Sequence, residues 1–236
     1  MKPTEYHCTV KSFRMLTPTV FEIGYETDKP LSFVGGQFIS IIIPGVGPNG
    51  KDLRRAYSIA SSPEMRPLEL CIKLVEGGPG TQYLFRLRPG DTFKALAAYG
   101  DFVYKPKQGC GVCFISTGTG IAPFRSIVLS EHYKNNPPIQ AHCLFGVRTE
   151  DELVYEEAFA GVPNLKFIPT VSQPKGSWKG FLGRVTHYLS TLDATYPWLE
   201  TEFYLCGNGS MIQEVKTFLS NKGVPKGSVH QEIYYR

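Results

Sequence analysis

The sequence predicts a β plus α/β protein of two domains, an N-terminal antiparallel β-barrel at residues 1–104 and a parallel-sheet α/β domain at residues 105–236. Up to about Tyr104, short strand-like runs are punctuated by Gly and Pro, as in antiparallel barrels and sandwiches. Further along, runs of this kind alternate with helix patterns, which is typical of a parallel sheet covered by helices. The polar stretch 105–109 separates the two textures, so we expect the link between the domains there.

Four segments of the first domain are the clearest strand candidates, because β-branched and aromatic residues stand there between turn residues. They cover residues 20–25, 37–43, 55–60 and 68–74. One helix is expected at residues 81–87, after the Gly-rich stretch 77–80 and before Pro89 and Gly90.

The second domain carries five strand candidates, at residues 112–116, 141–147, 166–171, 202–206 and 229–235. Between them, one helix is expected to begin at Thr149, whose hydroxyl and Glu152 three residues on have the spacing of a capping box. Another covers about residues 210–221, with apolar residues on one face and Gly223 just past its end. The ligand of such a sheet is expected beyond the carboxyl ends of its strands.

A glycine-rich turn follows the first of these strands, at Thr117-Gly118-Thr119-Gly120-Ile121-Ala122-Pro123. Glycine lets the backbone turn tightly and approach a ligand, and Pro123 suits the start of a helix. The free N–H groups of a helix start favour a pyrophosphate. Such turns also occur purely for tight packing. The Gly-x-Gly-x-x-Pro spacing, and the lack of an acidic residue in Gly146-Val147-Arg148, disfavour an ordinary Rossmann dehydrogenase.

Composition narrows the class of protein. The net charge of +4 is slight and the basic residues are dispersed, so we expect no nucleic-acid partner. No apolar stretch approaches the ~20 residues that a membrane helix requires, and the N-terminus lacks the apolar core of a signal peptide. We therefore expect a cytoplasmic protein with no membrane span.

The six cysteines include one CxxC pair, Cys110 and Cys113, and this spacing is one that metal sites and redox sites use. No second pair stands at zinc or iron–sulfur spacing. If the following strand already includes Cys110, residues three apart point to opposite faces and cannot share a ligand. We therefore expect structural cysteines and no metal.

At Arg54-Arg55-Ala56-Tyr57-Ser58 the sequence resembles the ferredoxin–NADP reductase family of flavoproteins, which includes the reductase components of oxygenases. The resemblance covers essentially the whole chain. It implies that this R-x-Y-S element binds the flavin, with the fork of Arg55 on phosphate, Tyr57 flat beside the isoalloxazine and the Ser58 hydroxyl near N5. Standing alone, the motif would indicate an ordinary amphipathic strand.

The resemblance implies further flavin contacts. Gly77, Gly78, Thr81 and Leu84 resemble the family's second flavin element, G-G-x-x-S/T-x-x-L, with an additional Pro79-Gly80 in the turn, so FAD is expected rather than FMN. Leu70-Cys71-Ile72-Lys73 resembles the strand that runs along the flavin, and Tyr99-Gly100-Asp101-Phe102 resembles G-P-Y/F-G-x-F without its leading G-P. The implied flavin-binding residues are Arg55, Ala56, Tyr57, Ser58, Ile72, Lys73, Gly77, Gly78, Gly80, Thr81 and Tyr234.

Cys206-Gly207-Asn208-Gly209-Ser210-Met211 resembles the family's C-G-x-x-x-M segment. The resemblance implies a nicotinamide-dinucleotide site in the second domain, with Cys206 near C4 of the nicotinamide; without the motif, Cys206 would be a small buried residue at a strand end. Glu232 and Tyr234 resemble the family's terminal acid and aromatic, although Tyr235 and Arg236 follow, so which tyrosine stacks on the flavin stays open. The catalytic candidates are thus Ser58, Cys206 and Glu232. The implied dinucleotide-binding residues are Thr117, Gly118, Thr119, Gly120, Pro123, Gly146, Arg148, Ser172, Cys206, Gly207 and Met211.

The implied reaction is hydride transfer between NAD(P)H and flavin N5, followed by electron transfer to a separate carrier such as ferredoxin or flavodoxin, or the reverse. An oxygenase component, a haem protein or free flavin is an alternative acceptor, and an FAD-stabilised regulatory subunit is the non-enzymatic alternative. NADH is favoured over NADPH, because Ser172-Gln173 stands where NADPH-selective members often have Ser-Arg, although Lys175, Lys179 and Arg184 follow nearby.

Overall fold

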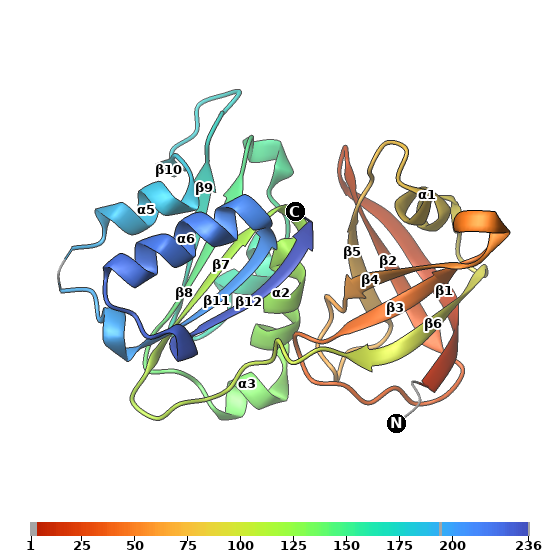
Figure 1. The fold of residues 1–236 in the computed structure, drawn as a ribbon, viewed down its shortest axis with the longest axis horizontal. Coiled ribbons are helices and arrows are strands. Elements are labelled where there is room, and N and C mark those ends of the chain that lie inside the picture. The colour runs from red at the N-terminus through yellow and green to blue at the C-terminus, as the bar shows by residue number, and fades with distance from the viewer. Residues whose placement is uncertain (1–3, 194, 236) are drawn as a thin grey trace. The chain divides into compact units, whose positions relative to one another are not determined.

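The computed structural model describes residues 4–193 and 195–235, and the chain divides into two compact units (Figure 1). The first comprises Met1–Tyr104 and Ala122–His132, and the second comprises Lys105–Ile121 and Tyr133–Arg236. Segment Ala122–His132 is thus grouped with the first unit, although in the chain it follows the first strand of the second.

The first unit is a six-stranded antiparallel sheet with the order β4-β3-β6-β1-β2-β5. Its two edge strands are joined just beyond β4, where Ile59 bridges Leu70 of β5 in antiparallel fashion and the Ala60 N–H donates to Glu69 O over 2.8 Å. This link closes the sheet into the expected barrel. The strands are β1 Thr4–Thr17, β2 Val20–Thr27, β3 Phe38–Ile43, β4 Leu53–Ser58, β5 Leu68–Lys73 and β6 Thr92–Tyr99.

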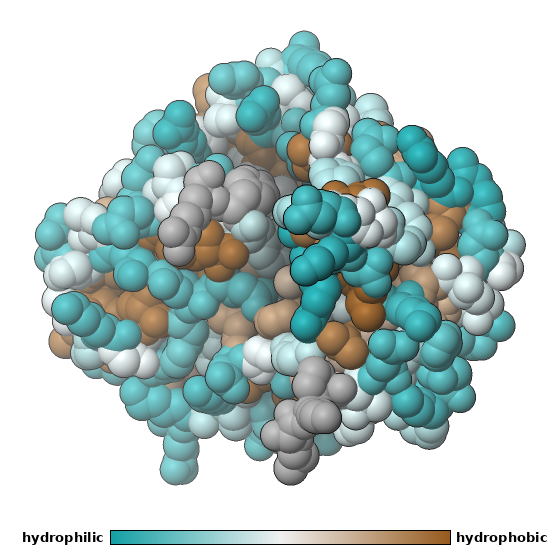
Figure 2. Space-filling view, turned by 45° about the vertical axis from the view of Figure 1, so that its right-hand side comes forward, coloured by the Kyte–Doolittle hydropathy of each residue, from teal (hydrophilic) through white to brown (hydrophobic). Residues whose placement is uncertain are grey.

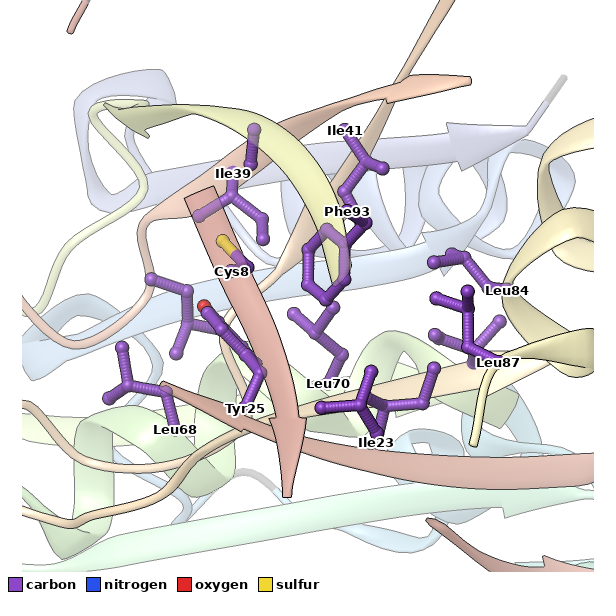
Figure 3. Packing of buried hydrophobic residues seen from close by; sticks show 14 of the residues in the cluster. Cys8, Ile23, Tyr25, Ile39, Ile41, Leu68, Leu70, Leu84, Leu87 and Phe93 are labelled. Carbon is purple, nitrogen blue, oxygen red and sulfur yellow. The ribbon is translucent and has the colours of Figure 1, made fainter. Parts of the chain in front are cut away.

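The barrel interior is filled by buried side chains of β1, β2, β3, β5 and β6 and of helix α1 (Pro79–Arg86), and Leu53 and Tyr57 of β4 pack against them. Figure 3 shows Leu84 of α1, and Leu87 just after it, beside Phe93 and Ile23 in this core. These leucines anchor the C-terminal end of α1 to the strands of the barrel. The predicted helix is confirmed, with its start two residues earlier than expected.

Two long strands of the barrel, β1 and β6, are absent from the clearest candidates of the sequence. In β1, buried Tyr6, Cys8 and Val10 alternate with less buried residues, but its second half is largely polar and exposed. The residue pattern of such a strand is a weak signal, because much of its length is exposed to solvent. Its place in the sheet is decided by pairing with the neighbouring strands.

The second unit is a six-stranded, all-parallel sheet with the order β10-β9-β8-β7-β11-β12. Every residue of β11 except Asn208 is buried, as expected for a strand covered on both faces. Helices α5 and α6 lie on one face (Figure 1) and share a core with the sheet. The strands are β7 Gly111–Thr117, β8 Ala141–Val147, β9 Leu165–Val171, β10 Phe181–Leu182, β11 Thr201–Asn208 and β12 Val229–Tyr235. Helix α2 (Ala122–Leu129) is grouped with the first unit, and α3 (Glu131–Asn135) spans the boundary between the units. The other α-helices of this part of the chain are α4 Glu156–Ala160, α5 Val185–Thr191 and α6 Gly209–Asn221.

The helix expected from Thr149 is wrong in form. The structure has a short 3-10 turn, η3 (Glu150–Glu152), and then α4, with Tyr155 between them in the left-handed region at φ 63°. The Thr149 hydroxyl caps no helix and instead donates to the Asp151 carboxylate, while Glu152 accepts the Arg148 N–H over 3.1 Å. Local hydrogen bonds of the Thr and Asp side chains therefore replace the helix cap that the spacing predicted.

Helix α2 is fixed to the first unit by polar side chains that are themselves buried. Arg125 forms an ion pair with Glu69 of β5 over 2.5 Å and donates to Ala60 O over 3.0 Å. The Ser126 hydroxyl donates to Ser61 O over 2.7 Å. The residues just after the R-x-Y-S strand are therefore held by the helix that directly follows the glycine-rich turn.

Hydrophilic side chains separate the apolar ones into small groups on the face shown in Figure 2. Over residues 4–193 and 195–235, no helix combines the length and hydropathy needed to span a membrane.

Glu202 of β11 is a buried carboxylate whose substitution tests the electrostatics of the second unit. Burial alone would raise its pKa, but hydrogen bonds from His230, Lys107 and Ser228 outweigh burial and lower the pKa below the ordinary 4.5. A group with a depressed folded pKa contributes stability above its unfolded pKa, and that contribution is lost as the pH falls through the folded pKa.

Glu202→Gln is therefore expected to lower the free energy of unfolding by about 1–3 kcal/mol at pH 7, since it removes charge-assisted hydrogen bonds. Below pH 4 the difference from the unsubstituted protein should shrink. Urea unfolding at pH 7 and pH 3.5 measures both values, with the exposed Glu200→Gln as the control. An equal loss at both pH values would contradict the charge argument.

Candidate functional site

In the first unit, strand β4 and the start of helix α1 meet at Gly80. A Cβ placed on this buried glycine would lie 2.9 Å from Tyr57 Oη, 3.0 Å from Ile43 Cδ1 and 3.1 Å from Arg55 Cγ. The fold therefore brings together the R-x-Y-S strand and the glycine turn, two elements that residues 59–76 separate in the chain. Gly80 itself is in packing contact, so its predicted role as a cofactor ligand remains a prediction.

The β4 side chains differ sharply in exposure. Arg55 and Ala56 are exposed, Tyr57 is half-buried and Ser58 is buried at the end of the strand. Burial raises the pKa of Tyr57 to about 12, although Arg55 opposes this, so its phenol is neutral at physiological pH. A neutral, flat ring beside an exposed guanidinium suits the aromatic and phosphate parts of a flavin nucleotide.

The turn that precedes α1 has an open side. Gly77 has φ +68°, a region that favours glycine, and nothing lies within 4 Å of a Cβ built there. The Thr81 hydroxyl accepts the Val75 N–H over 3.1 Å and lies 3.2 Å from Gly78 O, so it closes the turn. Gln82 is the first residue whose N–H bonds back to Gly78 O. Before it, Pro79 has no N–H and the Gly78 N–H donates to Val75 O over 3.0 Å, so Gly80 and Thr81 carry the N–H groups that this helix start offers to an anion, which fits the pyrophosphate of FAD.

Two other predicted flavin residues lie on β5. Ile72 is buried in the barrel core, opposite Phe21 of β2, so its side chain serves packing, whereas the next residue, Lys73, is exposed. Their contact with a flavin remains a prediction.

We expect Gly80→Ala to weaken FAD retention by about 10-fold, because the new methyl must displace Tyr57 or Arg55 in a closely packed contact. The measurement is the FAD dissociation constant by flavin fluorescence, with Gly227→Ala as the control because nothing lies within 4 Å of a Cβ there. Unchanged retention in Gly80→Ala would show that the contact of α1 with β4 does not shape the site.

In the second unit, the ends of β7 and β11 are pressed together by glycines. A Cβ on Gly120 would lie 2.7 Å from the carbonyl carbon of Cys206 and 2.9 Å from Gly207 Cα. Gly207, at φ +132°, would in turn place a Cβ 2.5 Å from Thr117 Oγ1. The Asn208 N–H donates to that same oxygen over 3.2 Å. The predicted turn therefore lies so close to the end of β11 that neither Gly120 nor Gly207 could carry a side chain.

The next strands end in the same row, as the sequence predicted. Thr117 of β7 lies opposite Gly146 of β8, which lies opposite Thr170 of β9. Beyond them, the Ser172 N–H donates to Val147 O over 3.2 Å, and Arg148 is exposed. A ligand at this edge would contact backbone and the small residues Thr117, Gly146 and Thr170 at the strand ends, and the charged Arg148 just beyond them.

Cys206, at the carboxyl end of β11, lies in a cluster with Glu232 and Tyr234 of β12. Its thiol is fully buried, and burial raises its pKa well above the usual value, with the charge of Glu232 adding to the shift and a hydrogen bond from Tyr234 opposing it. The thiol therefore stays protonated at physiological pH. Glu232 stands opposite Cys206 in the parallel register, which is why the C-terminal acid and aromatic reach this position.

Helix α6 begins directly after this strand. Asn208 is its N-cap, and its side-chain oxygen accepts the Ser210 N–H over 2.8 Å. Met211 is buried in the sheet–helix core, so its predicted role in dinucleotide binding would be indirect. Asn208 was not among the predicted site residues, although an Asn before a helix is a recognisable capping signal.

The remaining predicted residues lie outside these clusters. Pro123 is the second residue of α2, which is grouped with the first unit. Of the CxxC pair, Cys110 lies in a turn before β7, while burial raises the pKa of Cys113 to about 12 and the Tyr196 hydroxyl bonds to it. The strand does not include Cys110, so the argument from opposite faces does not apply. Among the described residues, no group of three or more His, Cys, Asp or Glu could hold a metal ion.

Two family models match the two parts of the chain. The oxidoreductase FAD-binding domain matches residues 13–104, and the oxidoreductase NAD-binding domain matches residues 114–217. Ferredoxin–NADP reductase B of Sorangium cellulosum is 32% identical over 241 residues, which cover 97% of both chains. This chain belongs to the ferredoxin–NADP reductase family.

Other relatives and solved structures agree on the fold of this reductase. The reductase component DmpP of phenol 2-monooxygenase from Pseudomonas sp. is 28% identical over 98% of the chain, which spans 66% of that relative. The cytochrome P450 reductase GcoB of Amycolatopsis superposes with a TM-score of 0.87 at 24% identity, over 99% of this chain and 70% of that one. A ferredoxin NADP+ reductase from Neisseria gonorrhoeae with bound FAD and NADP gives 0.83 at 22% identity, over 99% of both chains.

The reductase is thus a flavin-dependent oxidoreductase with an FAD-binding and an NAD-binding domain. The open cradle at Gly77 fits the pyrophosphate of FAD. The predicted fold class and cofactors are confirmed, while the roles of the individual residues remain predictions.

Proposed function

We propose that the reductase takes a hydride from a reduced nicotinamide and passes electrons singly to a separate carrier protein, a ferredoxin, a flavodoxin or an oxygenase component. The observation that carries this proposal is the neutral thiol of Cys206, fully buried at the carboxyl end of β11 beside Glu232 and Tyr234. A module that only bound FAD for stability would not need a second, NAD-binding domain.

In this proposal each group of residues has one task. Gly118 and Gly120 admit the dinucleotide pyrophosphate to the helix start. The neutral thiol of Cys206 packs at the nicotinamide without adding a charge. Glu232, opposite Cys206 in the register of β11 and β12, is proposed to keep that thiol protonated, because its charge adds to the effect of burial on the pKa. Ser58, buried at the end of β4, is proposed to orient the flavin ring.

Bound FAD supplies the step between two-electron and one-electron chemistry. The acceptor is proposed from relatives: one is named a ferredoxin–NADP reductase and another a reductase component of a phenol monooxygenase. Since the donor is a soluble nicotinamide, we also propose that the reductase works in the cytoplasm.

The test is an anaerobic titration of the flavin-loaded protein with NADH and, in parallel, with NADPH, following loss of the oxidised flavin absorbance. Rapid bleaching by either donor, with reduction of added ferredoxin, is the expected result. Bound flavin that neither donor bleaches would overturn the proposal in favour of a regulatory subunit. Protein that retains no flavin but reduces free flavin would favour a flavin reductase.

A further inference from the structure

We propose that Gln37 is a positioning residue of the flavin site, which fixes Ser58 at the end of β4 by tying together three segments of the first unit. The proposal rests on the proposed role of Ser58 in orienting the flavin ring. Gln37 is half-buried, stands directly before β3 and is not among the predicted site residues. The contacts that carry the proposal all lie within the first unit.

The backbone of Gln37 holds the chain directly after Ser58. The Ile59 N–H donates to Gln37 O over 3.0 Å. Phe38, the next residue of the chain, lies opposite Ser58 in the antiparallel register of β3 and β4. Because β4 has β3 as its neighbour in the sheet order, this end of β4 follows the start of β3. A displacement of Gln37 is therefore passed on to Ser58.

The side chain of Gln37 fixes that backbone from two sides. Its Oε1 accepts the Val34 N–H over 2.9 Å, and its Nε2 donates to Gly100 O over 3.0 Å. A side-chain amide both accepts and donates, so this one group joins the loop before β3 to the segment after β6. The Gln37 N–H also donates to Val34 O over 3.1 Å, which closes the loop.

The bond to the segment after β6 lies where the strand ladder is irregular. Phe38 of β3 is opposite Tyr99 of β6. Farther along β3, Ser40 is opposite Leu96, so the register shifts between the two pairs. Backbone pairing is disrupted at such a shift, and bulges of this kind are frequent beside functional sites. The Gln37 side chain thus supplies a link that the ladder lacks here.

This link joins two segments that the family resemblance assigns to the flavin, the R-x-Y-S strand and Tyr99–Phe102. Phe38 lies opposite Ser58 on one side and Tyr99 on the other, and residues opposite each other in adjacent strands share a face. The rings of Phe38 and Tyr99 stack, with 5.6 Å between their centroids. Ser58, Phe38 and Tyr99 therefore form one row across three strands, and Gln37 holds both ends of that row.

The chain beyond Ser58 has anchors of its own. The two residues after Ile59 accept hydrogen bonds from side chains of α2, and Ile59 itself bridges β5. Gln37 is not part of the buried barrel core. Loss of its side chain is therefore expected to shift the end of β4 without unfolding the barrel.

The experiment compares Gln37→Met, which keeps the size of the side chain but can form neither hydrogen bond, with Leu31→Ala. Leu31 is the control, because it is buried in the barrel core and precedes Gln37 in the same loop. The first measurement is hydrogen exchange of the Ile59 amide, relative to the other slowly exchanging amides of the barrel. This relative rate should rise about 10-fold in Gln37→Met and stay unchanged in Leu31→Ala.

The second measurement is flavin bleaching at saturating NADH. The limiting rate should fall about 10-fold in Gln37→Met, whereas KM for NADH and the FAD dissociation constant change less than about 3-fold, because misalignment of the ring slows hydride transfer more than it weakens binding. In Leu31→Ala the limiting rate should stay unchanged.

Gln37→Glu tests the bond to Gly100 by rescue. The new carboxyl still accepts the Val34 N–H, but it donates to Gly100 O only when it is protonated. The carbonyl and the neighbouring Asp101 carboxylate both favour the protonated form. The limiting rate, divided by that of the unsubstituted protein at the same pH, should therefore recover as the pH is lowered from 8 to 5.

Unchanged exchange of Ile59 in Gln37→Met overturns the inference, and so does an equal loss of bleaching rate in Gln37→Met and Leu31→Ala. If Gln37→Met does not fold, Gln37→Glu decides, and a relative rate that does not recover at low pH overturns the inference. If neither donor bleaches the flavin, the proposed function fails, while exchange of the Ile59 amide still tests whether Gln37 holds the end of β4.

Discussion

Gly120→Ala is expected to lower kcat/KM for the nicotinamide donor by about 100-fold or more, while FAD retention stays unchanged. The new Cβ would lie 2.7 Å from the carbonyl carbon of Cys206 and 2.9 Å from Gly207 Cα. Both neighbours are backbone atoms, so the glycine turn and the end of β11 must separate. A displacement of about 1 Å of groups that align a reacting ring is enough for a 100-fold loss.

Stopped-flow bleaching of the flavin by NADH measures this effect, and flavin fluorescence measures retention. The control is Gly161→Ala, because Gly161 has an ordinary φ of −90° and no atom within 4 Å of a built Cβ. A Gly120→Ala protein that bleaches at the normal rate would show that the turn does not hold the donor.

Glu69→Gln is expected to lower the free energy of unfolding by about 3–5 kcal/mol. Arg125 is only 7% exposed, and Glu69 is its ion-pair partner at 2.5 Å. The substitution leaves a buried guanidinium beside a neutral amide, and an uncompensated buried charge is costly. For a chain of this size the loss corresponds to a fall in Tm of roughly 6–20 °C.

Thermal unfolding of the flavin-loaded protein measures the change. Glu26→Gln is the matched control, since Glu26 pairs with Lys11 over 2.8 Å but both side chains are more than 40% exposed. Such a pair is worth about 1 kcal/mol or less. Equal shifts in the two variants would mean that burial of the Arg125 pair has no energetic consequence.

Local patterns in the sequence were sufficient wherever a single element decides the outcome. The glycine turn at 117–120, the strand at 202–206 and the helix after Asn208 follow from apolar runs, turn residues and capping signals, and the structure has them at nearly the predicted bounds. The helix expected from Thr149 fails for a local reason as well. A capping-box spacing identifies side chains that can form hydrogen bonds but not the partners that they choose. Here the Thr149 hydroxyl bonds to Asp151, and Glu152 accepts the Arg148 N–H.

Contacts between distant segments were not available to such patterns. That Gly80 packs on Tyr57, that Arg125 pairs with Glu69 and that Glu150 holds Lys175 each depend on how strands and turns approach in space. Charged residues in particular look alike in the sequence, whether they are exposed or buried.

The sequence by itself determined the order of the two architectures, the positions of the two glycine-rich turns and, through its motifs, the family. Periodicity and turn chemistry are short-range properties, so they can be read along the chain. Only the tertiary structure decided that β1 and β6 complete the barrel, that the C-terminal Glu232 and Tyr234 reach Cys206, and that the acidic turn η3 faces Lys175. These are consequences of strand pairing and burial, whose energies arise between residues far apart in the chain.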